Sequence, residues 1–122
     1  MPRFLILMVE EEHFARWDAA DEALRERVFA DFRAFTKAVR ERGRFRGGEA
    51  LAHPKEARTL RADQGAGRQI TEGPYAETVE QLGGMYLVEL PDLATALEVA
   101  ALLPREYDLE VRECLDVGVP DE

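Results

Sequence analysis

The fold is decided by residues 71–88, which read TEGPYAETVEQLGGMYLV. The first part, up to Gly84, is polar and contains the rigid break Gly73-Pro74, so it predicts a loop. The last part, from Met85 to Val88, is an apolar run that predicts a buried strand. A polar loop fixed to the end of a core strand is a place where small proteins often carry binding or catalytic groups.

The chain before this stretch predicts a strand, a long helix and a second strand. Residues 4–9 form a continuous apolar run, which predicts a strand buried on both faces. Apolar residues then recur every three or four positions as far as Arg42, which predicts a helix that begins near Asp18 or Asp21. The second strand is predicted at residues 47–51, before a proline that stops it.

A hairpin, a helix and a last strand complete the prediction. Short segments at 57–61 and 68–71 predict a hairpin insert. Asp92 predicts the start of a second helix, which ends before Pro104. Residues 109–112 alternate between apolar and polar and predict the last strand. The order β-α-β, hairpin, β-α-β is an α+β fold with the split βαβ, or ferredoxin-like, arrangement.

The predicted sheet has a face that its own helices cannot cover. Two helices cover one face of a four-stranded sheet, yet the strands at 4–9 and 85–88 are apolar on both faces. The economical cover for the second face is the same face of another copy. We therefore expect a homodimer formed by sheet-to-sheet packing, which a lysine at Leu7 or Met8 disrupts.

Composition limits the class of protein. The chain has 122 residues, and we expect one domain over residues 1–119 with a frayed tail at 120–122. Its 25 acidic and 16 basic residues give a net charge of −9, which argues against nucleic acid and anionic membrane as partners. The single Cys114 fits a reducing compartment, and no apolar run is long enough to span a bilayer. We expect a cytoplasmic protein.

Residues 72–84, EGPYAETVEQLGG, closely resemble the signature of the DGPF proteins of the YCII-related family, usually DGPFAETKEQLGG. Three other segments look like their counterparts in that family: 32–35 on the first helix, 47–51 on the second strand and 110–112 on the last strand. The resemblance covers nearly the whole chain. It implies a single YCII-related domain that forms a dimeric α/β barrel.

The chain departs from the family pattern at three places. Glu72 stands where the signature usually has Asp, and Tyr75 stands where it has Phe. YCII-like enzymes are proposed to use a His on the first helix with a nearby Asp. That His would fall near Asp31, where this chain has none. The resemblance therefore carries over no His-dependent proton transfer.

Carboxylates are the main candidates for a site. Glu49 follows two glycines that permit close backbone approach, and glutamates of the signature could converge on it. Paired carboxylates in a half-buried cleft raise one pKa and support general acid–base catalysis. They could also hold a hard cation through oxygen ligands. The candidate catalytic residues are Glu49, Glu72, Tyr75 and Glu77. The candidate ligand-binding residues are Glu49, Glu72, Tyr75, Glu77, Thr78 and Arg112.

The same residues also have structural interpretations. Glu77, Thr78 and Gln81 could bind backbone groups and hold the signature segment folded, and Arg112 could neutralise a carboxylate. The two histidines are interpreted as an exposed residue and a turn residue, and their spacing matches no metal-ligand pattern. We expect no metal and no cofactor.

Three functions remain open from the sequence. The first is a small-molecule enzyme or ligand-binding homodimer with a carboxylate-lined cleft near the signature. The second follows from the resemblance: genes of DGPF proteins commonly neighbour those of extracytoplasmic-function sigma factors, which implies an accessory or regulatory protein of that pathway. The third is a structural oligomer without a ligand.

Overall fold

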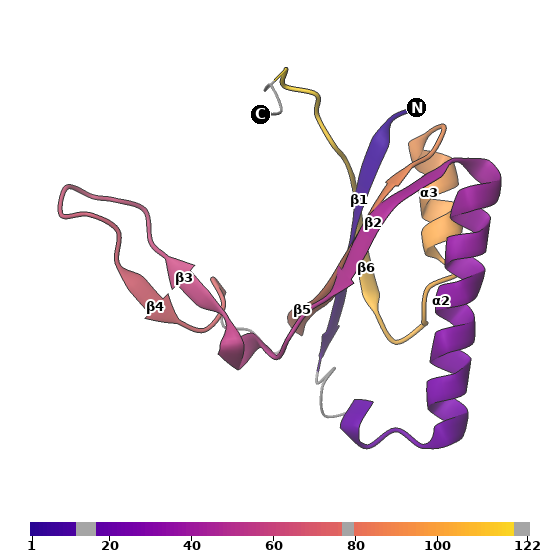
Figure 1. The fold of residues 1–122 in the computed structure, drawn as a ribbon, viewed down its shortest axis with the longest axis horizontal. Helices are drawn as coiled ribbons and strands as arrows, with labels where there is room; N and C mark the ends of the chain where they lie inside the picture. The colour runs from indigo at the N-terminus through magenta and orange to yellow at the C-terminus, as the bar shows by residue number, and fades with distance from the viewer. Residues whose placement is uncertain (12–16, 77–79, 119–122) are drawn as a thin grey trace.

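A computed structural model of the protein describes residues 1–11, 17–76 and 80–118. The chain folds into a four-stranded antiparallel sheet with two helices on one face (Figure 1). The strands, in sheet order, are β2 (Arg44–Ala50), β5 (Glu80–Glu89), β1 (Arg3–Glu11) and β6 (Asp108–Glu113). The helices are α2 (Glu22–Arg42) and α3 (Leu93–Ala100). His13, Glu77, Thr78 and the tail at 119–122 lie outside the described residues.

The strand order is that of two interleaved βαβ units. α2 connects β1 to β2, and β5 lies between these two strands. α3 connects β5 to β6, and β1 lies between these two. Each hydrogen-bonded strand pair is antiparallel, with Ile6 opposite Tyr86 in one pair and opposite Val111 in another. The predicted α+β class and split βαβ order are confirmed.

Both helices begin at an aspartate cap. The Asp21 carboxylate accepts from the Leu24 N–H at 2.8 Å, so Asp21 rather than Asp18 is the start of α2. The Asp92 carboxylate accepts from the Thr95 N–H at 2.8 Å in the same way. α3 ends at Ala100, earlier than predicted, because turn hydrogen bonds replace helical ones before Pro104. No helix in the described parts of the chain is long and apolar enough to cross a membrane.

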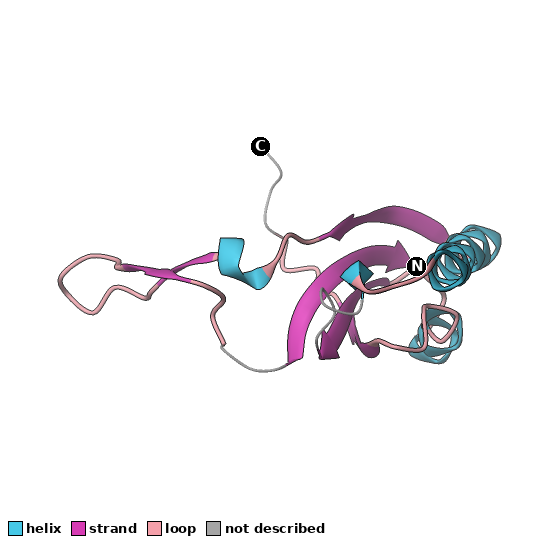
Figure 2. Cartoon of the chain, turned by 90° about the horizontal axis from the view of Figure 1, so that it is seen from below, coloured by secondary structure: helices cyan, strands magenta, loops and turns pink. Residues whose placement is uncertain are grey.

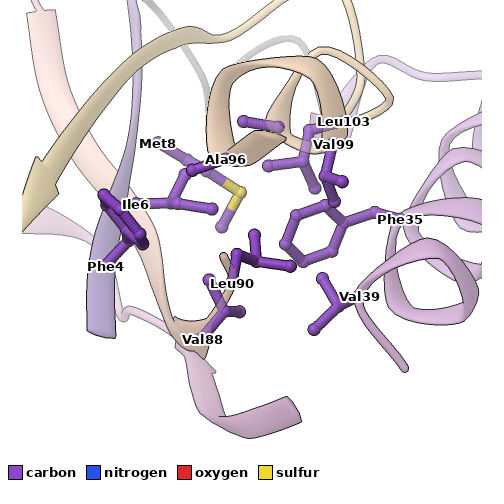
Figure 3. Close-up of a cluster of buried hydrophobic side chains, with 11 residues drawn as sticks. Phe4, Ile6, Met8, Phe35, Val39, Val88, Leu90, Ala96, Val99 and Leu103 are labelled. Carbon is purple, nitrogen blue, oxygen red and sulfur yellow. The ribbon is translucent and has the colours of Figure 1, made fainter. Parts of the chain in front are cut away.

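The core lies between the sheet and the two helices (Figure 3). On β1 it takes the even-numbered residues, since Phe4 and Ile6 are 0% exposed and Met8 is 5% exposed. Successive residues of a strand point to opposite faces, so Leu5 and Leu7 lie on the other side. The strand at 4–9 is therefore fully buried on one face and half-buried on the other. Met8 faces the helices, so the expectation that it lies on the uncovered face of the sheet is wrong.

The sheet face opposite the helices is named here the open face. It carries a central apolar group on β1 and β5, and no helix covers it in the described parts of the chain (Figures 1 and 2). This group consists of Leu5, Leu7, Val9, Met85 and Leu87. All five are only half-buried. The two-sided apolarity of the central strands is thus present in the structure.

Two strands begin earlier than predicted. β5 starts at Glu80, so the second half of the signature is a strand paired to β1 and not a loop. β2 starts at Arg44, directly after Gly43, whose Cβ would stand 1.9 Å from the Glu89 carbonyl oxygen. Backbone pairing decides both boundaries. The sequence did not predict these starting points, because polar residues and glycines occupy both segments.

The predicted hairpin is confirmed as β3 (Arg58–Leu60) paired antiparallel with β4 (Ile70–Glu72). A short 3₁₀ turn, Pro54–Glu56, precedes it. The hairpin forms a separate two-stranded sheet and projects on the side of the open face, away from the helices (Figures 1 and 2). At its tip the Asp63 carboxylate accepts two backbone N–H groups, from Gly65 at 2.8 Å and Gly67 at 2.9 Å.

Candidate ligand-binding cleft

A cleft lies between α2 and one end of the sheet, named here the helix-side cleft. It consists of two adjoining hollows, which share Trp17, Val28 and Tyr107. The larger, of about 540 Å³, is the aromatic hollow; its lining is Met8, Trp17, Val28, Phe29, Phe32, Gly48, Glu49, Ala50, Leu51, Gly83, Tyr86 and Tyr107. The smaller, of about 340 Å³, is the acidic hollow; its lining is Glu10, Trp17, Ala19, Ala20, Asp21, Leu24, Val28, Pro104, Glu106 and Tyr107.

Aromatic rings in mutual contact form the walls of the larger hollow. The Phe32 ring centroid lies 6.4 Å from that of Tyr86 and 6.3 Å from that of Tyr107. Trp17 meets Phe29 edge to face, with centroids 5.7 Å apart. Such contacts hold the rings in fixed orientations. The hollow is therefore a mainly aromatic and apolar site with two phenol groups, those of Tyr86 and Tyr107.

Tyr107 lies where the two hollows meet. Burial, and then the neighbouring charges of Glu10 and Glu106, raise the pKa of Tyr107 to about 12. Its hydroxyl therefore keeps its proton at neutral pH and remains a hydrogen-bond donor. Burial also raises the pKa of Tyr86. Glu10, only 6% exposed at the end of β1, brings a shielded carboxylate into the acidic hollow.

An arginine on α2 pairs with one of the carboxylates that line the acidic hollow. Arg27 forms ion pairs with Glu106 and, at 3.1 Å, with Asp31 one turn along the helix. Its hydrogen bond lowers the pKa of Glu106, and the same contact raises the pKa of Arg27. The other Glu106 oxygen, Oε1, is buried and has no hydrogen-bond partner among the described residues. Asp31, near the expected position of the family's histidine, is thus engaged by Arg27.

Of the predicted site residues that the structure describes, only Glu49 belongs to the lining of the cleft. It stands at the edge strand β2 and is exposed. Its partner in register is Met85, which places its side chain on the open face. Arg112 is also on that face and pairs with Glu110, two residues earlier on β6.

Glu72 and Tyr75 lie on and beside the hairpin, not in the helix-side cleft. Glu72 is exposed and pairs in register with Arg58. Tyr75 is 80% exposed, with the Arg61 guanidinium carbon 5.5 Å from the centre of its ring. Of the described signature residues, only Gly83 lines the aromatic hollow. The structure does not bring Glu49 and Glu72 to one hollow.

The first half of the signature is bonded to the hairpin. Gly73, at φ +90°, donates its N–H to the Ala57 carbonyl at 2.8 Å, and its own carbonyl accepts from the Thr59 hydroxyl at 3.0 Å. The Gln81 amide donates to the Ala76 carbonyl at 3.2 Å. These bonds agree with the structural interpretation of Gln81. His53 is likewise a turn residue, since its Nδ1 accepts from the Lys55 N–H at 3.1 Å.

Sequence reasoning missed the residues that form the acidic hollow. A signal for Glu10 was present: it continues the even-numbered series of β1 that faces the helices, after Met8. It was grouped instead with the acidic run that ends the strand. Glu106 and Tyr107 lie in a short connection with no periodic pattern. In the described parts of the chain, no three His, Cys, Asp or Glu residues are placed to hold a metal ion.

Two comparisons with known proteins bear on this domain. The family model of the YCII-related domain matches residues 3–113. An uncharacterized protein of Rhizobium meliloti (strain 1021) is 35% identical over 91 residues, which cover 75% of this chain and 70% of that protein. The family match spans both helices, all strands and the helix-side cleft.

Proposed function

This chain belongs to the YCII-related family, and on that premise we propose that it binds a small organic molecule in the helix-side cleft and acts as a homodimer. The observation that carries the proposal is the aromatic hollow. Its volume of about 540 Å³ is in the usual range for ligand sites, and apolar walls with few polar groups are typical of them.

The acidic hollow supplies the polar groups of the proposed site. Glu10 and Glu106 provide carboxylates, and Tyr107 provides a hydroxyl that remains protonated. A carboxylate and a phenol at the edge of an apolar pocket orient a bound molecule through hydrogen bonds. The same pair of groups supports a proton transfer, so an enzyme of the acid–base class is compatible with this site.

We propose that a second copy covers the open face. The half-buried group that includes Leu7 and Met85 supports this, because an apolar sheet face of this kind is normally covered. The hairpin projects to the same side, which would bring Glu72 and Tyr75 towards the partner (Figure 1). In this arrangement the predicted residues Glu49, Glu72, Tyr75 and Arg112 lie at or near the dimer interface.

The proposed binding site can be tested through Trp17, the one tryptophan of the chain. Its indole N–H gives a single resolved NMR signal at a residue that lines both hollows. We expect neutral aromatic fragments, such as benzyl alcohol, to shift this signal in a saturable way. A fragment set that leaves the signal unmoved at millimolar concentration contradicts the proposal.

A pair of alanine variants provides the matched control. Ala50 lines the aromatic hollow, whereas Ala94 is exposed on α3 and lines neither hollow. The variant Ala50→Phe fills the hollow and is expected to abolish the shift of the Trp17 signal. The variant Ala94→Phe adds the same ring elsewhere and is expected to leave binding unchanged.

A further inference from the structure

We propose that the occupant of the helix-side cleft is an organic cation, with an ammonium group at the acidic hollow and an apolar body in the aromatic hollow. This inference rests on the proposed function and assigns the chemical class of its ligand. It combines two independent features: the carboxylates that line the acidic hollow and the aromatic rings at the junction of the two hollows.

Every charged side chain that lines the cleft among the described residues is a carboxylate. Glu10, Asp21 and Glu106 line the acidic hollow, whereas the side chain of Glu49 lies on the open face. The Glu10 carboxylate is almost fully buried, so little solvent screens its field. Arg27 balances Glu106, but it is shared with Asp31. Arg105 also pairs with Glu106, and Arg25 lies over the Trp17 ring. None of these arginines lines either hollow, so the lining itself presents carboxylates.

A buried oxygen in this cleft lacks a donor. Glu106 accepts from Arg27 through Oε2, while Oε1 has no partner in the described part of the chain. A buried acceptor without a donor is destabilising, so a ligand that supplies the donor is favoured. An ammonium group carries three donors and a positive charge. A neutral alcohol offers one donor, and an anion such as a carboxylate offers none.

The rings at the junction suit a cation. Trp17 and Tyr107 line both hollows, so they flank the point where a charged head meets its apolar body. Electron-rich ring faces attract cations, and tryptophan does so most strongly. Trp17 already shows this preference within the chain, because the Arg25 guanidinium carbon lies 5.3 Å from its ring centre.

The lining argues for an organic cation over a metal ion. Hard metal ions require several oxygen ligands that converge on one point. No group of three such side chains exists among the described residues. The large apolar part of the aromatic hollow also needs a carbon-containing body to fill it.

Three probes of similar size test the assignment: benzylammonium, benzyl alcohol and benzoate. Each is titrated at neutral pH and low salt against the full-length protein, with the Trp17 indole signal as readout. We expect benzylammonium to bind about tenfold more tightly than benzyl alcohol. We expect benzoate to give no saturable shift, and added salt to weaken benzylammonium alone.

Glu10→Gln keeps the shape of the side chain and removes its charge. We expect it to weaken benzylammonium about tenfold and to leave benzyl alcohol unchanged. Glu98→Gln on α3 is the control, because Glu98 is 69% exposed and lines neither hollow. If Glu10→Gln does not fold, Glu106→Gln replaces it, because Glu106 also lines the acidic hollow, and a loss of benzylammonium affinity with unchanged benzyl alcohol affinity is expected.

The outcomes separate this inference from the proposed function. Tighter or equal binding of benzyl alcohol or benzoate overturns the cation and leaves the cleft as a binding site. If Glu10→Gln, or the cleft variant that replaces it, binds benzylammonium as well as the wild type does, the inference is overturned too. If neither these probes nor any fragment of the neutral set moves the Trp17 signal, both the inference and the proposed function fail.

Discussion

Gly48 of β2 lies against the ring of Tyr86 of β5, its partner in register. A Cβ atom on residue 48 would stand 2.3 Å from Cδ1 and 2.6 Å from Cε1 of that ring. The ring in turn packs against Phe35, at 4.7 Å between centroids, and lines the aromatic hollow. The absence of a side chain at Gly48 therefore sets the position of one wall of the cleft.

Gly48→Ala is expected to displace the Tyr86 ring. Because that ring is packed against the core, we expect a loss of about 1–3 kcal/mol in the free energy of unfolding, measured by chemical denaturation, together with a shifted Trp17 NMR signal. Gly47→Ala is the control, since a Cβ there meets nothing within 4 Å. Equal stability of the two variants would refute the proposed role of Gly48.

Leu7→Lys and Met8→Lys distinguish the two faces of β1. Leu7 is half-buried on the open face, and Met8 is 5% exposed in the core. We expect Leu7→Lys to yield a folded monomer and Met8→Lys to unfold the chain, because a charge in the core has no partner. Light scattering reports the mass, and circular dichroism reports the fold. A monomeric wild type at micromolar concentration would rule out the homodimer.

The ion pair of Arg27 and Glu106 predicts how stability depends on pH. The pKa of Glu106 is lowered in the folded state, so its contribution is present above the ordinary glutamate pKa of about 4.3 and is lost as the pH falls through the lower folded value. At neutral pH we expect Glu106→Gln to cost about 1–2 kcal/mol. This difference should shrink steadily in acid. A difference from wild type that stays constant with pH would contradict the assignment.

Asp21→Ala tests the start of α2. The Asp21 carboxylate caps the helix by accepting from the Leu24 N–H, and loss of such a cap costs about 1 kcal/mol. Asp18, which the sequence offered as the alternative start, makes no cap to this helix. We expect Asp18→Ala to be neutral within about 0.5 kcal/mol. Thermal denaturation of both variants compares them directly, and a larger loss at Asp18 would reverse the assignment.

The fold was accessible from the sequence because its signals are local. The helical spacing that ends at Arg42, the capping aspartates at 21 and 92, and the alternation at residues 109–112 each depend on neighbouring residues. The start of β5 at Glu80 was missed, because its pairing with β1 joins backbone atoms far apart in the chain. Side-chain polarity contains little information about such pairing.

The cleft was harder to predict from the sequence, because it too depends on contacts between residues far apart in the chain. Its walls come from the end of β1, the turn at Trp17, the middle of α2, and the two tyrosines at 86 and 107. No sequence spacing relates these positions, so their proximity appears only when the sheet and helix are assembled. Glu49 was identified because the adjacent glycines marked it. Glu10 was hidden inside an acidic run that resembled a solvent-exposed end.

The hairpin of β3 and β4 is a place where the chain can accept inserted residues. Among the residues that the structure describes, it shares no strand pair with the main sheet, and its tip turns on Gly65 and Gly67, both at positive φ. An insertion between these glycines lengthens the hairpin without shifting the register of any strand in the core. The tip is therefore a natural place for a label or an affinity peptide. In relatives it is a segment whose length and composition can diverge independently of the core.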